Sequence, residues 1–503
     1  MPAARLASVF LCAALFALPP AAHADETAPI AWTEPGSARQ SPSRGGTGTL
    51  PGSPDTIAWT EPGSARQSPS RGGAGTLPGS PDTTGSFTDG IFLRSRDGEL
   101  VLFPGARLQV DGAFFPRQTP KSGVFIRRAR VELRGWLGPM FYFDVAGDFA
   151  PGPPAGADVA PSALPAADAY LAFAPFGDQL ILQAGEFDAP FTLENRTSDE
   201  YTDFIERAMV ARTLGAPLNK EVGVMAHGLL ADGRLYYSGG LFNGEGPGFR
   251  NLDNQTDSIG RVVLTPFATS ARPWRGFAIG GSAWYGNHVL GPEAPAQATP
   301  GGMVFFEPHW TSGQTNPLAF ELHEQGNATA FGGELNLPIG ERFGLRGEVV
   351  WKRQHLVEND TSASPSAPVG DAVLDGIAAY GEVWFWLWGD ARLLPAPGLE
   401  LPLRVAGEAP FGSLLPEGLE LAVRGELLTE NLTSDNTALG DPGISTTRVT
   451  TGTVGLNYWR GRFVRLSANY VVNEWSGTSI TVMELASQGK FEQELLVRFA
   501  ASL

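Results

Sequence analysis

The sequence predicts an all-β protein: a transmembrane antiparallel β-barrel of about sixteen strands, with long extracellular loops and mostly short periplasmic turns. From about residue 99 onward, segments of roughly ten residues alternate in hydrophobicity and are separated by turn residues, which is the pattern of a membrane barrel. The 63 glycines and four lysines are typical of β-structure with many turns. Beyond the N-terminus no run of about 18 apolar residues predicts a transmembrane helix.

The first 24 residues have the features of a cleavable signal peptide, so we expect the chain to be exported. Arg5 precedes an apolar run at residues 6–18, and an Ala-His-Ala cleavage signal ends at residue 24. The apolar run is too short to span a bilayer. Cleavage would remove Cys12, the single cysteine, and we therefore expect no disulfide and no thiolate metal site in the mature chain.

Residues 25–84 are predicted to be a disordered tail rich in Pro, Gly and Ser, and residues 85–503 to be the outer-membrane barrel. Within the tail, residues 57–83 repeat the 27-residue unit of residues 30–56, with Thr47 replaced by alanine in the second copy. This near-identity indicates a recent tandem duplication in a tolerant segment. The alternative is a spacer or a tail that contacts peptidoglycan.

Sixteen segments carry the strand pattern, an even number as expected for a bacterial single-chain barrel. In chain order they are residues 100–115, 123–137, 140–150, 167–176, 178–187, 219–230, 233–243, 257–267, 276–287, 328–338, 342–355, 376–389, 418–429, 449–459, 462–473 and 490–503.

The alternation divides each strand into a row facing water and a row facing lipid, because a charge at mid-bilayer costs about 2–4 kcal/mol. In the second strand one face is expected to hold Ile126, Arg128, Arg130, Glu132 and Arg134. The opposite face would hold Arg127, Ala129, Val131 and Leu133. Arg127 would then lie near a strand end or extend its charged group toward the interface.

A soluble β-sandwich also alternates, but its polar face looks outward and its core faces are sealed. Aromatic residues near strand ends favour the membrane barrel, since such residues form girdles at the two interfaces. The predicted girdle residues are Trp384, Trp386, Trp388, Tyr458 and Trp459.

Connection lengths predict the orientation, since short turns are periplasmic and long loops extracellular. Short turns are expected at residues 137–140, 176–178, 231–233, 338–342 and 459–461. Long connections are expected at residues 151–166, 188–218, 244–256, 288–327, 356–375, 430–448 and 474–489. The connection at residues 390–417 breaks this rule, because it is long and falls on the periplasmic side.

Other classes of function have little support in the sequence. The formal net charge of −17 argues against a nucleic-acid partner. No nucleophile elbow, P-loop or HExxH motif is present, so no enzyme and no cofactor is predicted. The histidines that remain after signal cleavage have no metal-like spacing: His227, His288, His309, His323 and His355.

Several stretches resemble the phosphate-selective porin O and P family of outer-membrane porins. The stretches are LVLFPGARLQVDGAFF at 100–115, FIRRARVELRGWLGPMFYFDVAGDF at 125–149, GEFDAPFTLENRTSDEYTDFIERAMV at 185–210, LAVRGELLTE at 421–430, VGLNYWRGRFVRLSANYVVN at 454–473 and FEQELLVRFAASL at 491–503. The resemblance implies a homotrimer of sixteen-stranded barrels in the outer membrane, with a loop folded into each lumen and a preference for anions such as phosphate. The family's central lysine cluster has no counterpart, because the four lysines are far apart.

The resemblance also implies a row of arginines that line the lumen. Arginine suits phosphate because its planar guanidinium donates two hydrogen bonds at once and stays charged. The candidates on the predicted inward face are Arg107, Arg128, Arg130, Arg134, Arg261, Arg346, Arg424, Arg465 and Arg498. The alternative is that these arginines pair with inward carboxylates and only hold the wall together. Those carboxylates are Asp111, Glu132, Asp144, Asp148, Glu348, Glu426, Glu492 and Glu494.

The long connection at residues 188–218 is the candidate constriction loop, with Arg196, Glu206, Arg207 and Arg212 as its candidate site residues. By resemblance, Glu206 and Arg207 anchor this loop; the alternative is a loop that lies over the mouth. Three hypotheses follow: a porin for small anions, a general or weakly cation-preferring porin, and a structural or adhesive barrel whose tail is the active part.

Overall fold

The computed structural model describes residues 83–85, 91–116, 122–150, 166–215, 219–248, 251–270, 274–289, 291–312, 318–361, 367–390, 398–399, 401–404, 417–435, 444–461, 463–479, 482, 485–487, 489 and 491–503. All of them lie in one compact unit, Gly73–Leu503. The predicted signal peptide and almost all of the predicted tail lie outside the described residues. Within the described part of the chain, no helix is long and apolar enough to cross a membrane.

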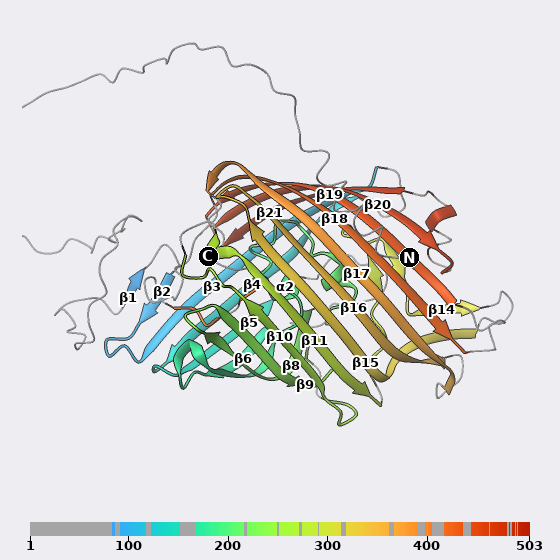
Figure 1. The fold of residues 1–503 in the computed structure, drawn as a ribbon, viewed down its shortest axis with the longest axis horizontal. Helices are drawn as coiled ribbons and strands as arrows, with labels where there is room; N and C mark the ends of the chain where they lie inside the picture. The colour runs from blue at the N-terminus through green and yellow to red at the C-terminus, as the bar shows by residue number, and fades with distance from the viewer. Residues whose placement is uncertain are drawn as a thin grey trace, which may run out of the picture. The chain divides into compact units, whose positions relative to one another are not determined.

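Sixteen antiparallel strands form one closed barrel, which confirms the predicted fold class (Figure 1). Their bounds are β3 Leu100–Phe114, β4 Gly123–Leu137, β5 Phe141–Asp148, β6 Ala166–Phe173, β7 Ile181–Asp188, β8 Lys220–Leu230, β9 Leu235–Phe242, β10 Asp257–Leu264, β11 Ala278–His288, β15 Leu318–Pro338, β16 Phe343–Asp360, β17 Ala367–Asp390, β18 Glu417–Ser434, β19 Ile444–Arg460, β20 Val464–Gly477 and β21 Phe491–Ser502. Each strand pairs with its neighbour in sequence, and β21 pairs with β3 to close the ring, so that Arg498 lies opposite Asp111.

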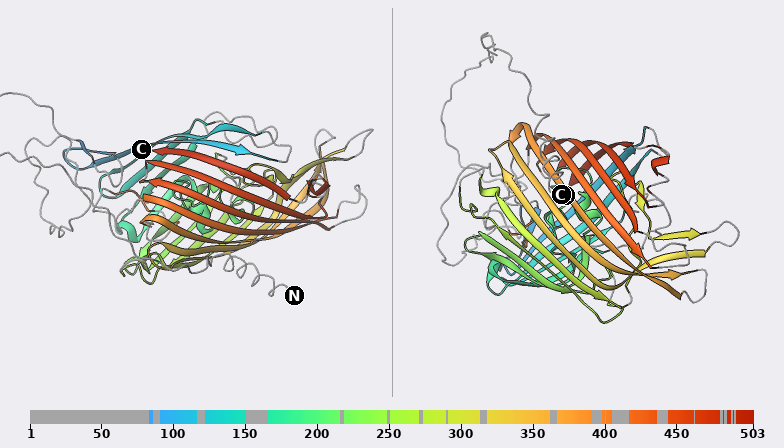
Figure 2. Two further views of the ribbon diagram at one scale, coloured as in Figure 1. Left: turned by 90° about the horizontal axis from the view of Figure 1, so that it is seen from above. Right: turned by 45° about the vertical axis from the view of Figure 1, so that its right-hand side comes forward.

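The second half of the barrel has longer strands than the sequence predicts. β15 to β19 extend well past the predicted segments, and Figure 2 shows them crossing the wall obliquely side by side. The pairing of β16 with β17 runs from Phe343 to Asp360, so the predicted loop at residues 356–375 is mostly strand. The predicted loop at residues 430–448 shrinks in the same way. Strand pairing continues past the apolar band because it still satisfies the backbone hydrogen bonds of the paired residues.

Short additional strands lie outside the ring of sixteen. β1 Thr83–Gly85 pairs with β2 Ile91–Arg94, which in turn pairs with the start of β3. β14 His309–Ser312 pairs antiparallel with the start of β15, and β12 Gln297–Ala298 pairs with β13 Val304–Phe306 as a separate hairpin.

The two faces of the wall differ in polarity as the alternation predicts. The outer face exposes large apolar side chains, among them Val131 at 57% and Leu171 at 66% exposure. The inner face buries charged side chains such as Arg107, Glu348 and Arg498. A charged row can be kept inside only where it meets water or an ion-pair partner, so the barrel interior is the place to look for a functional site.

A β-bulge corrects the predicted face of Arg127. Gln109 pairs with Arg128 and the next residue of β3 pairs with Ile126, so β4 carries one extra residue at Arg127. The bulge turns Arg127 inward, where its guanidinium lies 3.1 Å from the Glu206 carboxylate. Ile126, predicted to face inward, is exposed on the outer face with Val131.

The predicted aromatic girdle is wrong for three of its five members. Trp384, Trp386 and Trp459 are buried inside the barrel, where they pack around Phe204. A second bulge, between Trp386 and Trp388 in the pairing of β17 with β18, turns Trp388 outward to 49% exposure. The spacing of aromatic residues alone therefore does not distinguish an outer girdle from an inner cluster.

Candidate functional site

The connection between β7 and β8 folds into the barrel instead of covering its mouth. Within it, helices α2 Leu193–Arg196 and α3 Met209–Arg212 are almost entirely buried, and Figure 1 shows α2 inside the ring of strands. Its apolar side chains pack on the inner wall, where Phe191 contacts Trp284 edge to face and Met209 joins the same buried cluster. We call residues 189–215 and 219 the inner loop.

Carboxylates of the inner loop form ion pairs with arginines of the wall. Asp199 approaches Arg107 to 2.5 Å and Arg128 to 3.1 Å. Asp203 lies 2.8 Å from Arg346 on the opposite side of the barrel. The inner loop is therefore attached by ion pairs to strands that are far apart around the ring.

Wall carboxylates in turn receive backbone N–H groups of the inner loop. The Glu348 carboxylate accepts hydrogen bonds from the backbone N–H groups of Leu193 and Glu194, at 2.7 and 2.9 Å. The Glu426 carboxylate accepts one from Met209 at 2.6 Å. These donors are the unpaired groups at the starts of α2 and α3, so acidic residues are favoured there.

All nine predicted wall arginines lie on barrel strands, and each has a carboxylate or backbone carbonyl partner at 3.9 Å or less. The remaining partners are Glu132 for Arg134 at 3.0 Å, Glu334 for Arg261 at 2.6 Å, Glu426 for Arg424 at 3.0 Å, the carbonyl of Thr202 for Arg465 at 2.6 Å and Asp111 for Arg498 at 2.7 Å. Arg130 has only distant carboxylates, at 3.7 Å and beyond.

The predicted constriction residues are all in the inner loop, but the arginines among them donate to backbone carbonyls of the loop and of the elements next to it. Arg196 donates to the carbonyl of Asp188, and Arg207 donates to the carbonyls of Glu194 and Thr197. Arg212 donates to the carbonyls of Arg207 and Ala298. Glu206 instead pairs with the wall, through Arg127.

For Asp199 and Glu206, two of the loop carboxylates that meet wall arginines, burial raises the pKa but the nearby positive charges lower it by more. Arg107 and Arg128 hold the pKa of Asp199 well below its ordinary value. Arg127 and Arg498 lower the pKa of Glu206 to about 2. Both groups are therefore anionic at neutral pH, and they neutralise part of the arginine row.

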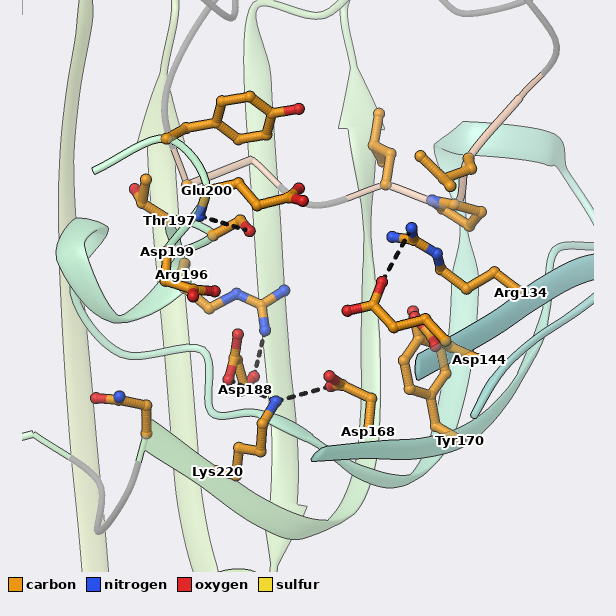
Figure 3. A pocket seen from close by; sticks show the side chains of 18 of the residues that line it. Arg134, Asp144, Asp168, Tyr170, Asp188, Arg196, Thr197, Asp199, Glu200 and Lys220 are labelled. Atoms are coloured by element: carbon orange, nitrogen blue, oxygen red, sulfur yellow. Dashed lines mark hydrogen bonds and ion pairs between the residues drawn. The ribbon is translucent and has the colours of Figure 1, made fainter. Parts of the chain in front are cut away.

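Between the inner loop and the wall from β3 to β8 lies a polar chamber of about 330 Å³ (Figure 3). Its seven cationic side chains are Arg107, Arg128, Arg130, Arg134, Arg196, Arg207 and Lys220. Its six carboxylates are Glu132, Asp144, Asp168, Asp188, Asp199 and Glu200. Lys220 bridges Asp168 and Asp188 at 2.8 and 2.9 Å, as Figure 3 shows.

The described residues of the connection between β17 and β18, residues 398–399 and 401–404, also lie inside the barrel, at the end with the short turns. The backbone carbonyl of Gly398 accepts a hydrogen bond from Arg261, and that of Leu403 accepts one from Trp136, both at 2.6 Å. Arg404 pairs with Asp178 at 2.5 Å. We call residues 398–399 and 401–404 the inward segment.

The sequence prediction gave no role to this connection. The signal that could have identified it is the alternation of Leu399, Leu401 and Leu403 in what the connection rule made a periplasmic turn. Leu399 and Leu401 pack against a buried cluster that includes Tyr236. The inward segment thus forms one side of the chamber.

At the end with the long connections, the hairpin of β12 and β13 packs into the barrel above the inner loop. Gln297 donates to the Glu430 carboxylate at 2.9 Å, and the backbone N–H of Gly301 donates to Glu494 at 2.7 Å. Phe305 and Phe306 join the buried cluster of the inner loop. Among the residues that the structure describes, no group of three or more acidic, histidine or cysteine side chains is arranged to hold a metal ion.

Comparison with known proteins connects this architecture to porins. The family model of phosphate-selective porin O and P matches residues 106–282, from β3 to β11 and including the inner loop, which confirms the resemblance predicted from the sequence. No curated protein sequence matches the chain.

Solved structures that are similar include three outer-membrane proteins. OmpT of Vibrio cholerae has 9% identity and a TM-score of 0.47, and the match covers 80% of this chain and 98% of that one. The anion-selective porin of Comamonas acidovorans has 11% identity and a TM-score of 0.42, with 80% and 100% covered. The outer membrane channel DcaP of Acinetobacter baumannii has 10% identity and a TM-score of 0.42, with 82% and 99% covered.

Proposed function

Because residues 106–282 match the phosphate-selective porin O and P family, we propose that the chain is a bacterial outer-membrane porin, a diffusion channel that passes small solutes and prefers anions such as phosphate. The single observation that carries the preference is the chamber, in which cationic side chains outnumber carboxylates seven to six although the whole chain has a net charge of −17. The chain acts as a homotrimer, as the family resemblance implies, and its short turns face the periplasm.

Anions would cross by exchanging between guanidinium groups along the wall. A pore conducts when each site binds weakly enough to release the ion to the next. The carboxylates that already pair with Arg107, Arg128 and Arg346 weaken each site in this way, because an incoming anion competes with a tethered one. The pairing lowers affinity while the net charge of the chamber still favours anions.

A second candidate is a general or weakly cation-preferring porin, and a count of buried charges favours it. Among the described residues, nineteen Asp and Glu residues are buried but only seven arginines. Many of these carboxylates lie outside the chamber, on β8 to β18, such as Glu221, Glu382 and Glu420. If ions pass along that wall, the field there attracts cations.

The reversal potential of the purified full chain in a planar bilayer across a KCl gradient separates the two candidates. A reversal potential of the anion sign, with added phosphate reducing the chloride current, supports the first candidate. The cation sign supports the second candidate and contradicts the anion preference. The absence of channels from correctly folded protein would contradict both candidates.

A further inference from the structure

One side of the chamber is apolar, and this surface would contribute nothing to the binding of an inorganic anion. Leu399, Leu401, Pro402 and Leu403 of the inward segment line it. The hydrogen bonds from Arg261 and Trp136 to the backbone of the inward segment fix these side chains in place. A fixed apolar surface in a chamber of charged groups favours a solute with an apolar part.

Two arginines of the chamber keep hydrogen-bond donors available for a solute. Among the described residues, neither Arg130 nor Arg134 donates a side-chain hydrogen bond, and their side chains keep 12% and 18% exposure. The Nε group of each is buried, so the terminal guanidinium nitrogens are the donors that a solute can reach. Their carboxylate neighbours lie at 3.7 Å or more for Arg130 and at 3.0 Å for Arg134. Arg107 and Arg128, by contrast, already donate to Asp199 and Gln109.

The carboxylates of the chamber disfavour a second negative group on the solute, although Lys220 neutralises part of the charge of Asp168 and Asp188. Asp144 lies opposite Arg134 in the pairing of β4 with β5, and its Oδ1 atom is buried without a hydrogen bond. Figure 3 shows Asp144 beside Arg134, and Asp168 and Asp188 on either side of the Lys220 amine. A second carboxylate on the solute would meet these like charges, which destabilise it.

The chamber volume of about 330 Å³ lies within the range of about 300–1,000 Å³ that is typical of sites for small organic molecules. We propose that the chamber binds a small organic monocarboxylate with an apolar body, its carboxylate at Arg130 and Arg134 and its body against Leu399 and Leu401. This inference rests on the proposed channel function and names the solute class of the same chamber.

Two measurements on the full chain keep the solute class and the channel function distinct. Calorimetric titration in detergent with sodium hexanoate, sodium acetate and inorganic phosphate measures binding without any requirement for current. Block of the KCl current by the same three anions in planar bilayers measures transport. Currents without preferential hexanoate binding would overturn the inference alone, whereas hexanoate binding without currents would overturn the channel function alone.

We expect hexanoate to bind at a concentration roughly tenfold lower than acetate or phosphate, since a few buried methylene groups are worth at least that factor. Leu401→Ser should remove this advantage while acetate binding stays the same. Arg134→Gln should weaken hexanoate and acetate alike. Leu252→Ser, at an exposed loop position outside the chamber, is the matched control and should change neither.

Two results would overturn the inference. One is that hexanoate binds the wild-type chain no better than acetate. The other is that Leu401→Ser keeps the full advantage of hexanoate although its circular dichroism spectrum matches the wild type. Arg134→Gln alters no residue of the inward segment, so it tests the carboxylate contact even if the serine variant fails to fold.

Discussion

Arg107 on β3 and Asp199 in the inner loop are 92 residues apart in the sequence, and their side chains meet at 2.5 Å inside the barrel. The contact ties the inner loop to the wall, and it neutralises the arginine that lies nearest to it. Arg128 shares the same carboxylate at 3.1 Å. One loop residue therefore both helps to hold the inner loop and neutralises part of the arginine row.

The bulge in β4 predicts that Arg127 and Val131 respond in opposite ways to a change of polarity. Arg127→Leu should destabilise the barrel by about 1.5–3 kcal/mol, because Glu206 loses a charged hydrogen-bond partner. Val131→Arg should cost about 2–4 kcal/mol, because it places a charge against lipid. Denaturant unfolding in lipid vesicles, followed by circular dichroism, measures both changes. A stabilising Arg127→Leu would show that this side chain faces lipid.

Trp386 and Trp388 are two residues apart but are predicted to differ in their effect on stability. Trp386 is 1% exposed and packs around Phe204 of the inner loop, so Trp386→Ala should cost about 3–5 kcal/mol and loosen the loop. Trp388→Ala, on the outer face, is the control and should cost less than about 1 kcal/mol. Unfolding curves measure the loss of stability, and current noise in planar bilayers measures the loosening of the inner loop. Equal costs would contradict the inner aromatic cluster.

The attachment of the inner loop should be insensitive to pH until the solution is strongly acidic. The pKa values of Asp199 and Glu206 are lowered in the folded barrel, so their contribution is fully present above their ordinary values of about 3.9 and 4.3. It is lost as the pH falls toward the pKa of Glu206, about 2. Single-channel conductance should be steady from about pH 7 to 5 and rise with added noise below about pH 4.

Glu206→Gln is the matched test of this pH dependence. The variant removes one of the two titrating groups but keeps the shape of the side chain, so its conductance at neutral pH should already be noisier. Its further change below about pH 4 should be smaller than that of the wild type. A conductance change centred near pH 6 in the wild type would show that other groups control the inner loop.

The strand plan could be predicted from the sequence because the lipid imposes it. Each of the sixteen predicted segments overlaps a strand of the barrel, since an apolar outer row is required at every crossing. The bulges at Arg127 and between Trp386 and Trp388 could not be predicted, because one extra residue changes the face of its neighbours without changing the composition. The long extensions of β16 and β17 could not be predicted either, because they lie beyond the apolar band and so lack an apolar outer row.

The site could be predicted only in part. The inward face of the arginines follows from alternation, but their partners depend on contacts between distant segments, such as Arg346 with Asp203. The inward segment was missed because the rule for connection lengths assigns it to a turn, whereas its leucines pack inside the barrel. Alternation gives the direction of a side chain, and only the tertiary structure shows what it meets.

The most direct test of the account is the reversal potential of Asp199→Asn across a KCl gradient, with Glu417→Gln at an exposed ion pair as the control. Removal of one negative charge beside Arg107 and Arg128 should raise the permeability ratio of chloride to potassium about two- to fivefold, since a charge at about 4 Å is worth about 1 kcal/mol even in water. Glu417→Gln should leave the ratio unchanged. An unchanged ratio in Asp199→Asn would contradict the claim that the inner loop and the arginine row together set the charge of the pore.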